Sequence, residues 1–139
     1  VEDNKKLAHE LRVQDHVLFA GSIPHQDLYA YYDMADIFLS LYDIGNVGNP
    51  IMEAMLMEKT ILTINNGDTK GIMGDSQQGL LLENTDQKLI DEGLLYLLDN
   101  PDQAKILAQQ AKRFANDYFW TWEERMQTEL NEVSKLLKR

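Results

Sequence analysis

Short apolar runs alternate along the chain with stretches in which apolar residues recur every three or four positions. The short runs are rich in leucine or in β-branched residues such as isoleucine, valine and threonine, which is typical of strands buried in a parallel sheet. They cover residues 17–21, 37–41, 60–64 and 79–82. The other stretches have the spacing of amphipathic helices. They cover residues 3–12, 26–34, 86–98 and 101–117, a helix that begins near residue 50, and a last helix that begins at Thr121 or Trp122.

This alternation predicts an α/β fold with a Rossmann-like parallel sheet flanked by helices. Strands that alternate with helices form right-handed units, and loops at the carboxyl ends of the strands make the ligand crevice. Three loops should lie at that edge: residues 21–25, 42–49 and 65–71. The length of 139 residues favours a single domain, residues 1–139, in which residues 119–139 form a terminal helix.

The middle loop runs into a helix through the stretch Gly45-Asn46-Val47-Gly48-Asn49-Pro50-Ile51-Met52-Glu53-Ala54-Met55. Asn49 can cap this helix, and Pro50 suits its first position. The glycines let backbone approach a ligand closely, and free N–H groups together with the helix dipole attract an anion. Glu53 lies one turn further on and could accept hydrogen bonds from hydroxyl groups of the same ligand. Taken alone, the loop favours an ordinary capped helix with an early glutamate over a phosphate and sugar site.

Charge and composition exclude several classes of function. The net charge of −10 leaves no basic stripe for a nucleic acid or an anionic membrane surface. Because the chain has no cysteine, it has no disulfide scaffold, thiolate metal site or cysteine nucleophile. No apolar run is long enough to span a membrane, so we expect a soluble, cytoplasmic protein. Any membrane contact should come only through parts outside this chain.

Other polar and aromatic residues carry weaker signals. The three histidines are scattered and lack the spacing of metal ligands. Asp68 and Asp75 are seven residues apart in a loop, which is poor evidence for a Mg²⁺ site. Lys70 is the cation of the 65–71 loop and is interpreted as a surface lysine. Trp120 and Trp122 are interpreted as packing anchors rather than as a platform for a sugar.

Several local matches occur in one order along the chain. The central ones are Ala35-Asp36-Ile37-Phe38 before a strand, Gly48 in the following loop and Glu53-Ala54-Met55 at the helix start. The flanking ones are Asp15-His16-Val17-Leu18-Phe19-Ala20-Gly21 upstream, and Asn66-Gly67-Asp68, Gly79-Leu80-Leu81-Leu82, Leu97-Leu98-Asp99-Asn100-Pro101 and Trp120-Thr121-Trp122-Glu123 downstream. This ordered set resembles the C-terminal domain of group 1 (family 4-like) glycosyltransferases, which have the GT-B fold. The resemblance covers nearly the whole chain.

The resemblance implies a binding site for a nucleotide-sugar donor. In that family the second glutamate of a Glu-x7-Glu motif binds the ribose hydroxyls, and Glu53 matches it. The first glutamate contacts the donor sugar and would fall at Gly45, which has no side chain to offer. Asn46 and Asn49 are candidate neutral partners for the sugar. Gly48 and Asn49 would offer backbone N–H groups to the phosphate or sugar.

Two outer loops complete the implied donor site. Gly21 and Ser22 could line a nucleobase pocket, although a plain turn between strand and helix fits them equally well. Gly67 and Asp68 occupy the place of the glycine-rich donor loop of the family. Asp43 is a further candidate to replace the first glutamate. The resemblance implies neither a metal ion nor a cofactor, because the nucleotide sugar is the substrate.

The chain also departs from the family in two respects. The basic pair of arginine and lysine that neutralises the diphosphate has no counterpart, and the acceptor-binding N-terminal domain is missing. We therefore expect the donor-binding domain of a retaining glycosyltransferase, part of a larger enzyme and inactive alone. One alternative is a degenerate module of the same fold that binds a nucleotide or supports assembly without chemistry. A dinucleotide-binding domain is disfavoured, because Gly-x-Gly-x-x-Gly is absent after the first strand.

Overall fold

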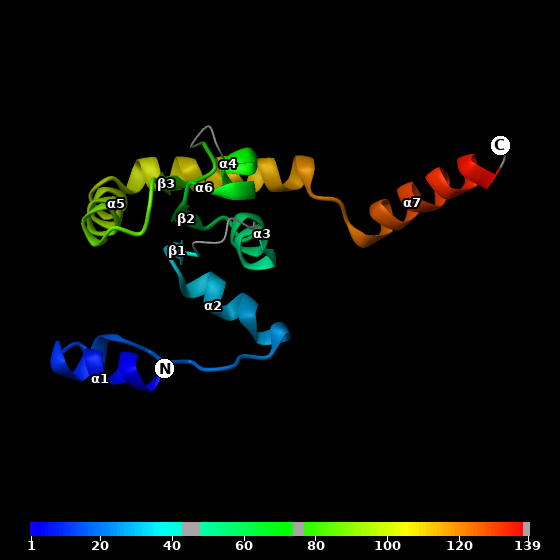
Figure 1. Cartoon of the computed structure of the whole chain (residues 1–139). Helices are drawn as coiled ribbons and strands as arrows, with labels where there is room; N and C mark the ends of the chain where they lie inside the picture. Colours follow the sequence, from blue (N-terminus) through cyan, green and yellow to red (C-terminus); the bar gives the residue numbers. More distant parts are fainter. Residues whose placement is uncertain (43–47, 74–76, 138–139) are drawn as a thin grey trace. The chain divides into compact units, whose positions relative to one another are not determined.

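The computed structural model describes residues 1–42, 48–73 and 77–137 (Figure 1). By their internal contacts these residues form two compact units, Val1–Tyr31 and Tyr32–Arg139. Helix α2, Leu28–Met34, contains the boundary between them. The second unit carries the sheet and most of the helices, so the fold class is decided there.

The first unit consists of short helices joined by extended backbone. It contains α1 (Glu2–Glu10), η1 (Gln14–His16), η2 (His25–Asp27) and the start of α2. The helices predicted over 3–12 and 26–34 are therefore confirmed to within a few residues. The strand predicted over 17–21 is wrong, and the side chains of Val17 and Leu18 are exposed. A strand needs a hydrogen-bonded neighbour, and no described residue pairs with this segment.

The second unit is built on a three-stranded parallel sheet. Its strands are β1 (Ile37–Ser40), β2 (Thr60–Ile64) and β3 (Leu80–Leu82), in the order β1-β2-β3. Leu39 pairs with Leu62, and Leu62 pairs with Leu80 on its other side. Every residue of β2 is buried, as expected for a strand that is covered on both faces. The parallel sheet and these three predicted strands are confirmed.

Helices α3 (Asn49–Leu56), α5 (Gln87–Asp99) and α6 (Pro101–Tyr118) pack against this sheet (Figure 1). One apolar cluster of buried residues consists of Leu62, Ile64, Leu82, Leu97 and Leu107, and the side chains of Met55, Ile61 and Met73 are also fully buried. Ala111 and Ala115 of α6 are fully buried, and their small side chains let α6 lie close to α3. The helical spacing of the apolar residues in α5 predicts that Leu98 also faces inward, but its side chain is exposed. Its neighbour Leu97 occupies the inward position, and one residue further along a helix points about 100° away.

The end of α3 is closed by a tight backbone motif. The N–H of Glu58 donates to the carbonyl of Met55 at 3.0 Å, and the N–H of Lys59 donates to the carbonyl of Ala54 at 2.9 Å. This pair of bonds is a Schellman motif, which places one residue in the left-handed region. That residue is Glu58, with φ of 55°. Its carboxylate also lies 3.0 Å from the ammonium group of Lys112 on α6.

Residues 65–71 contain a helix where the sequence predicted only a loop. Helix α4 runs from Gly67 to Met73 after the two asparagines. Thr69 and Met73, four residues apart, are both buried, so tertiary packing overrides the turn-forming composition of this segment. A Cβ atom on Gly79 would lie 2.8 Å from both the carbonyl oxygen of Ile61 and the Cε of Met73. Gly79 therefore allows the chain to enter β3 beside β2 and α4.

The last helix, α7 (Trp122–Leu137), is held by local interactions. The hydroxyl of Thr121 accepts from the N–H of Glu124, and the carboxylate of Glu124 accepts from the N–H of Thr121, which is a capping box. None of the described side chains of α7 is buried. The prediction that Trp120 and Trp122 anchor packing is wrong, because both side chains are exposed, although the guanidinium of Arg125 lies over the ring of Trp122. Across the described ranges, no helix has the length and apolarity to cross a membrane.

Candidate functional site

The carboxyl ends of β1 and β2 meet at one edge of the sheet. β1 leads toward α3, and β2 leads through two asparagines into α4. Ser40 and Thr63, near the ends of the two strands, are paired in register. The side-chain amide of Asn66 donates to the carbonyl oxygen of Tyr42 at 3.3 Å, which ties the two outgoing segments together. The structure thus brings Tyr42, where the predicted middle loop begins, and the 65–71 segment to a common edge.

A hollow of about 180 Å³ lies where β1 ends and α3 begins. Its lining is mostly apolar, with a serine hydroxyl and the backbone at the helix start, and it consists of Phe38, Leu39, Ser40, Leu41, Tyr42, Gly48, Pro50 and Ile51. Residues 43–47, which include Gly45, Asn46 and Asp43, lie outside the described residues. Of the described candidates for donor binding, Gly48 lines this hollow.

The first turn of α3 is organised by Gly48. Its backbone is extended, with φ of −74° and ψ of 165°, and its carbonyl accepts from the N–H groups of Ile51 and Met52. Gly48 is therefore the N-cap, and the prediction that Asn49 caps the helix is wrong, because the backbone of Asn49 already lies inside it. Pro50 follows within the first turn, where its missing N–H is not needed. The free end of the helix dipole points toward the region of the hollow.

Glu53 lies one turn inside α3 and is held by a tyrosine from α2. The hydroxyl of Tyr32 donates to the Oε2 of Glu53 at 3.0 Å, and it lies 3.2 Å from the carbonyl oxygen of Pro50. The ring of Tyr32 packs against Phe38 of β1, with the ring centres 5.8 Å apart. Burial, followed by the hydrogen bond and the charge of Glu53, raises the pKa of Tyr32 to about 12. The phenol therefore remains a donor throughout the neutral pH range.

The other predicted site residues are distributed between the two units. Gly67 and Asp68 are the first residues of α4, and both are exposed at the edge that α3 also reaches. Gly21 and Ser22 are exposed and belong to the first unit, where Gly21 has φ of 71°. Of the described candidates, the second unit thus brings Glu53, Gly48 and Asn49 onto one helix and places Gly67 and Asp68 at the same sheet edge.

Sequence reasoning missed two polar groups. In the sequence, Tyr32 shows only as one of the residues that share a face of the predicted helix over 26–34 with Leu28 and Tyr31. A buried tyrosine usually has a hydrogen-bond partner, which was the available signal. Asn65 directly follows β2, and its Oδ1 is buried without a hydrogen-bond partner among the described residues. Nothing in the spacing of the sequence distinguishes it from an ordinary turn asparagine.

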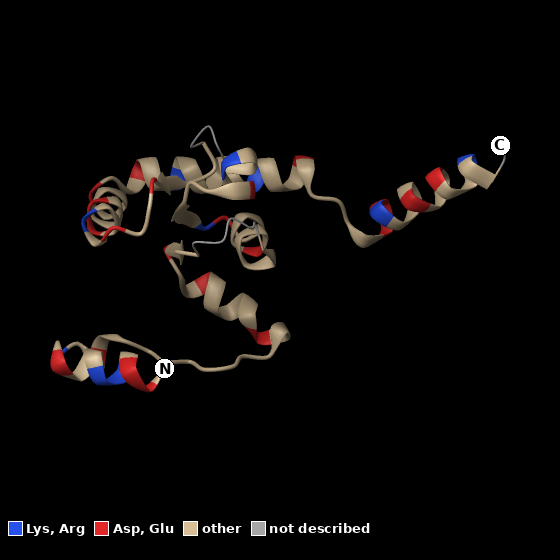
Figure 2. Cartoon of the chain, in the orientation of Figure 1, with Lys and Arg blue, Asp and Glu red and all other residues tan. Residues whose placement is uncertain are grey.

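The charges around the edge do not form a metal site in the described part of the chain. The residues that the structure describes contain no group of three or more histidine, aspartate or glutamate side chains that could hold a metal ion. Asp75, which was weighed as a ligand, lies outside them. Lys70 is exposed on α4. Lysine and arginine are interspersed with acidic residues along α1, α6 and α7 rather than gathered in a stripe (Figure 2).

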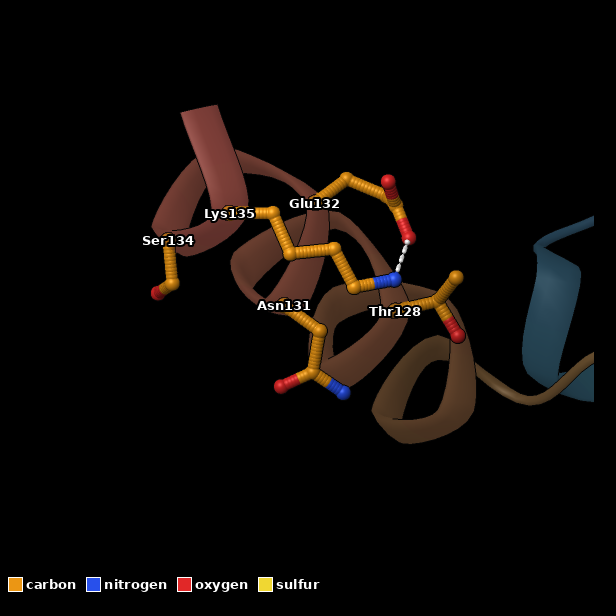
Figure 3. Close-up of a pocket in the computed structure, with 5 residues that line it drawn as sticks. All are labelled: Thr128, Asn131, Glu132, Ser134 and Lys135. Carbon is orange, nitrogen blue, oxygen red and sulfur yellow. Dashed lines mark hydrogen bonds and ion pairs between the residues drawn. The ribbon is translucent and has the colours of Figure 1, made fainter. Parts of the chain in front are cut away.

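A second depression lies on α7 and has a different character. Its lining comes from that helix alone and consists of Thr128, Asn131, Glu132, Ser134 and Lys135 (Figure 3). The ammonium group of Lys135 lies 2.6 Å from the carboxylate of Glu132, so its main charges are already paired. Because no second element contributes a wall, the depression is a surface groove between side chains of one exposed helix.

With this geometry described, comparison with known proteins assigns the family. The model of the family described as "Glycosyl transferases group 1" matches residues 2–114. The chain belongs to this family. The match extends through both units as far as Phe114, near the end of α6, and includes every described candidate for donor binding.

Curated proteins and solved structures extend the comparison. A GDP-mannose-dependent alpha-(1-6)-phosphatidylinositol monomannoside mannosyltransferase of Mycolicibacterium smegmatis is 26% identical over 132 residues, which is 90% of this chain and 34% of that enzyme. The C-terminal domain of the group 1 protein LpcC from Francisella tularensis has a TM-score of 0.75 at 19% identity and covers 84% of this chain and 60% of that one. Anabaena HepE, solved in complex with UDP, has a TM-score of 0.83 at 16% identity and covers 96% of this chain and 36% of that one.

These matches confirm the predicted fold. At identities below 20% the structural likeness shows the fold alone, which is that of the C-terminal domain of GT-B glycosyltransferases. The chain spans about a third of the length of the curated relatives that it matches, with 34% for the M. smegmatis enzyme.

Proposed function

We propose that this chain is the donor-binding part of a retaining glycosyltransferase, which transfers a sugar from a nucleotide diphosphate to an acceptor hydroxyl. The observation that carries the proposal is the position of Glu53. Its carboxylate lies one turn inside the helix that starts at the carboxyl edge of β1, and the hydroxyl of Tyr32 fixes it at 3.0 Å. In this position Glu53 binds the ribose hydroxyls, since a carboxylate accepts two hydrogen bonds from a diol.

The start of α3 suits the phosphate groups or the sugar of the donor. Gly48 has no side chain in the way, and its extended backbone leads into the positive end of the helix dipole. Asn49 and Asn46 serve as neutral hydrogen-bond partners for the sugar, with Gly45 beside them. Gly67 and Asp68, at the start of α4, border the same edge from β2. Gly21 and Ser22, which belong to the first unit, are the candidates for contact with the nucleobase.

The chemistry follows from this arrangement without a metal ion. The acceptor hydroxyl attacks the anomeric carbon while the bond to the nucleoside diphosphate breaks. The charge that develops on the leaving diphosphate is stabilised by backbone N–H groups at the start of α3 and by basic residues outside this chain. The acceptor is held by an N-terminal domain of the same polypeptide, so the 139-residue chain alone does not catalyse transfer.

Calorimetric titration of the full-length protein with UDP-, GDP- and ADP-sugars tests the proposal. The M. smegmatis relative is named as GDP-mannose-dependent and Anabaena HepE was solved with UDP, so both bases belong in the panel. Glu53→Ala should weaken binding of the preferred nucleotide sugar about 10- to 150-fold, because hydrogen bonds to a charged acceptor contribute about 1.5–3 kcal/mol. Glu58→Ala is the matched control, since it removes a glutamate just beyond the other end of the same helix. Unchanged affinity in a folded Glu53→Ala protein would contradict the assignment.

The alternative is a domain of the same fold that binds a nucleotide without transferring a sugar. Gly45 favours it, because a glycine stands where the sugar-binding glutamate of the family is expected. Nucleotide binding by the full-length protein, combined with the absence of nucleotide release from any sugar donor and acceptor tested, would support this alternative. Release of the nucleoside diphosphate that depends on Glu53 would exclude it.

A further inference from the structure

The hydroxyl of Tyr32 faces two acceptors on α3 at once. It lies 3.0 Å from the Oε2 of Glu53 and 3.2 Å from the carbonyl oxygen of Pro50. A phenol has a single proton, and a charged acceptor makes the shorter and stronger hydrogen bond. The proton is therefore directed mainly at the carboxylate, while the contact with Pro50 keeps the hydroxyl over the first turn of the helix.

The ring of Tyr32 is itself fixed in place. It is only 9% exposed and packs against Phe38, a residue of the strand that ends at the hollow. The ring of Tyr32 is therefore fixed by its packing against β1 and is not a mobile side chain. A donor that is immobilised in this way loses little entropy when its partner binds a ligand. Burial and the neighbouring carboxylate also keep the phenol protonated, since they raise the pKa of Tyr32 to about 12.

We propose that Tyr32 is a positioning residue for Glu53: its hydroxyl holds one carboxylate oxygen and so orients the carboxylate toward the ribose diol of the bound nucleotide. This inference rests on the proposed function of Glu53. A glutamate side chain has three rotatable bonds, and a diol is bound well only when both hydroxyls meet the carboxylate in one orientation. Tyr32 touches no substrate in this role, and its effect is transmitted through Glu53.

Tyr32 could instead have a purely structural role, in which it only connects α2 to α3. Comparing a ribonucleotide with a nucleotide that lacks the ribose hydroxyls distinguishes this role from the positioning of Glu53. The full-length protein is titrated with UDP, GDP and ADP. The nucleotide that binds with the highest affinity is then compared with its 2′,3′-dideoxy counterpart, which lacks the ribose hydroxyls. Tyr32→Phe keeps the ring against Phe38 and removes only the hydroxyl. It should lower the preference for the ribonucleotide over the dideoxynucleotide roughly three- to tenfold, as for the loss of one hydrogen bond. Its affinity for the dideoxynucleotide should not change.

Two reference variants complete the experiment. Tyr31→Phe, on the half-exposed neighbouring tyrosine, should leave the preference unchanged. Glu53→Ala should abolish it. If Tyr32→Phe weakens both nucleotides equally, or keeps the full preference while Glu53→Ala loses it, the role of Tyr32 is refuted and that of Glu53 stands. If the wild-type protein binds none of the three nucleotides, or Glu53→Ala keeps the preference, both proposals are refuted.

Discussion

Glu58 gives a direct test of the backbone geometry that ends α3. A residue other than glycine in the left-handed region is strained by about 1–2 kcal/mol, and Glu58 has φ of 55°. Glycine at this position removes the strain. It also gives the unfolded chain more conformational entropy, which destabilises the fold by about 0.4–1 kcal/mol. Replacement of Glu58 by glycine should therefore stabilise the fold by about 1 kcal/mol relative to replacement by alanine.

The comparison of Glu58→Gly with Glu58→Ala removes the ion pair from the difference, because both variants lose the carboxylate. The ion pair between Glu58 and Lys112 contributes little to stability. The side chain of Lys112 is 44% exposed and that of Glu58 is 38% exposed, and such exposed pairs stabilise a fold by about 0.2–1 kcal/mol. Glu58→Ala should thus be destabilised by about that amount, and Glu58→Gly should be equal to the wild type or slightly more stable. Lys112→Met measures the pair separately.

The assay is urea unfolding of each variant, followed by far-UV circular dichroism and analysed with a common m-value. A midpoint for Glu58→Gly that is no higher than that for Glu58→Ala would refute the left-handed conformation of this residue. A loss well above 1 kcal/mol in Lys112→Met would instead show that the ion pair, rather than the backbone motif, holds the end of α3.

Two further perturbations test the core and the alkaline behaviour. Gly79→Ala should destabilise the fold by about 1–3 kcal/mol, because the new methyl group would lie 2.8 Å from the backbone oxygen of Ile61. Gly71→Ala is the control: its methyl group would have nothing within 4 Å, so this variant should be neutral or more stable by up to about 1 kcal/mol. Equal urea midpoints for the two variants would contradict the packing around Gly79. Because the pKa of Tyr32 is raised from about 10 to about 12, the unfolded chain releases its phenolic proton first, and stability should fall by about 2 kcal/mol between pH 10 and 12. In urea unfolding across this range, Tyr32→Phe should lose that part of the slope, and an unchanged slope would refute the shift.

The sequence predicts best the elements whose burial is complete. The run from Thr60 to Ile64 has no polar alternation, and β2 is indeed buried on both faces. The run over 17–21 has similar residues but no strand partner among those described, and pairing across a sheet leaves no trace in a local pattern. The sequence does not predict helix α4, because its composition is typical of turns. The helix is stabilised by the burial of Thr69 and Met73, which depends on tertiary packing.

The candidate site shows a similar division. The role of Glu53 came from a family resemblance, because a glutamate in the first turns of a helix is chemically unremarkable. Its hydrogen-bond partner, Tyr32, is 21 residues away on another helix, a separation that no helical or strand period connects. Gly48 rather than Asn49 caps α3, and such boundaries shift by one residue without changing the pattern of apolar positions.

The position of both tryptophans has a consequence for spectroscopy. Trp120 and Trp122 are the two tryptophans of the chain, and they are 63% and 73% exposed at the entry to α7. Their emission therefore starts out close to that of tryptophan in water and reports on a helix whose described side chains are not buried. Intrinsic tryptophan fluorescence should therefore change little when the sheet unfolds. Tyr32 and Phe38, packed together at the edge of the site, are the natural place to introduce an optical reporter for it.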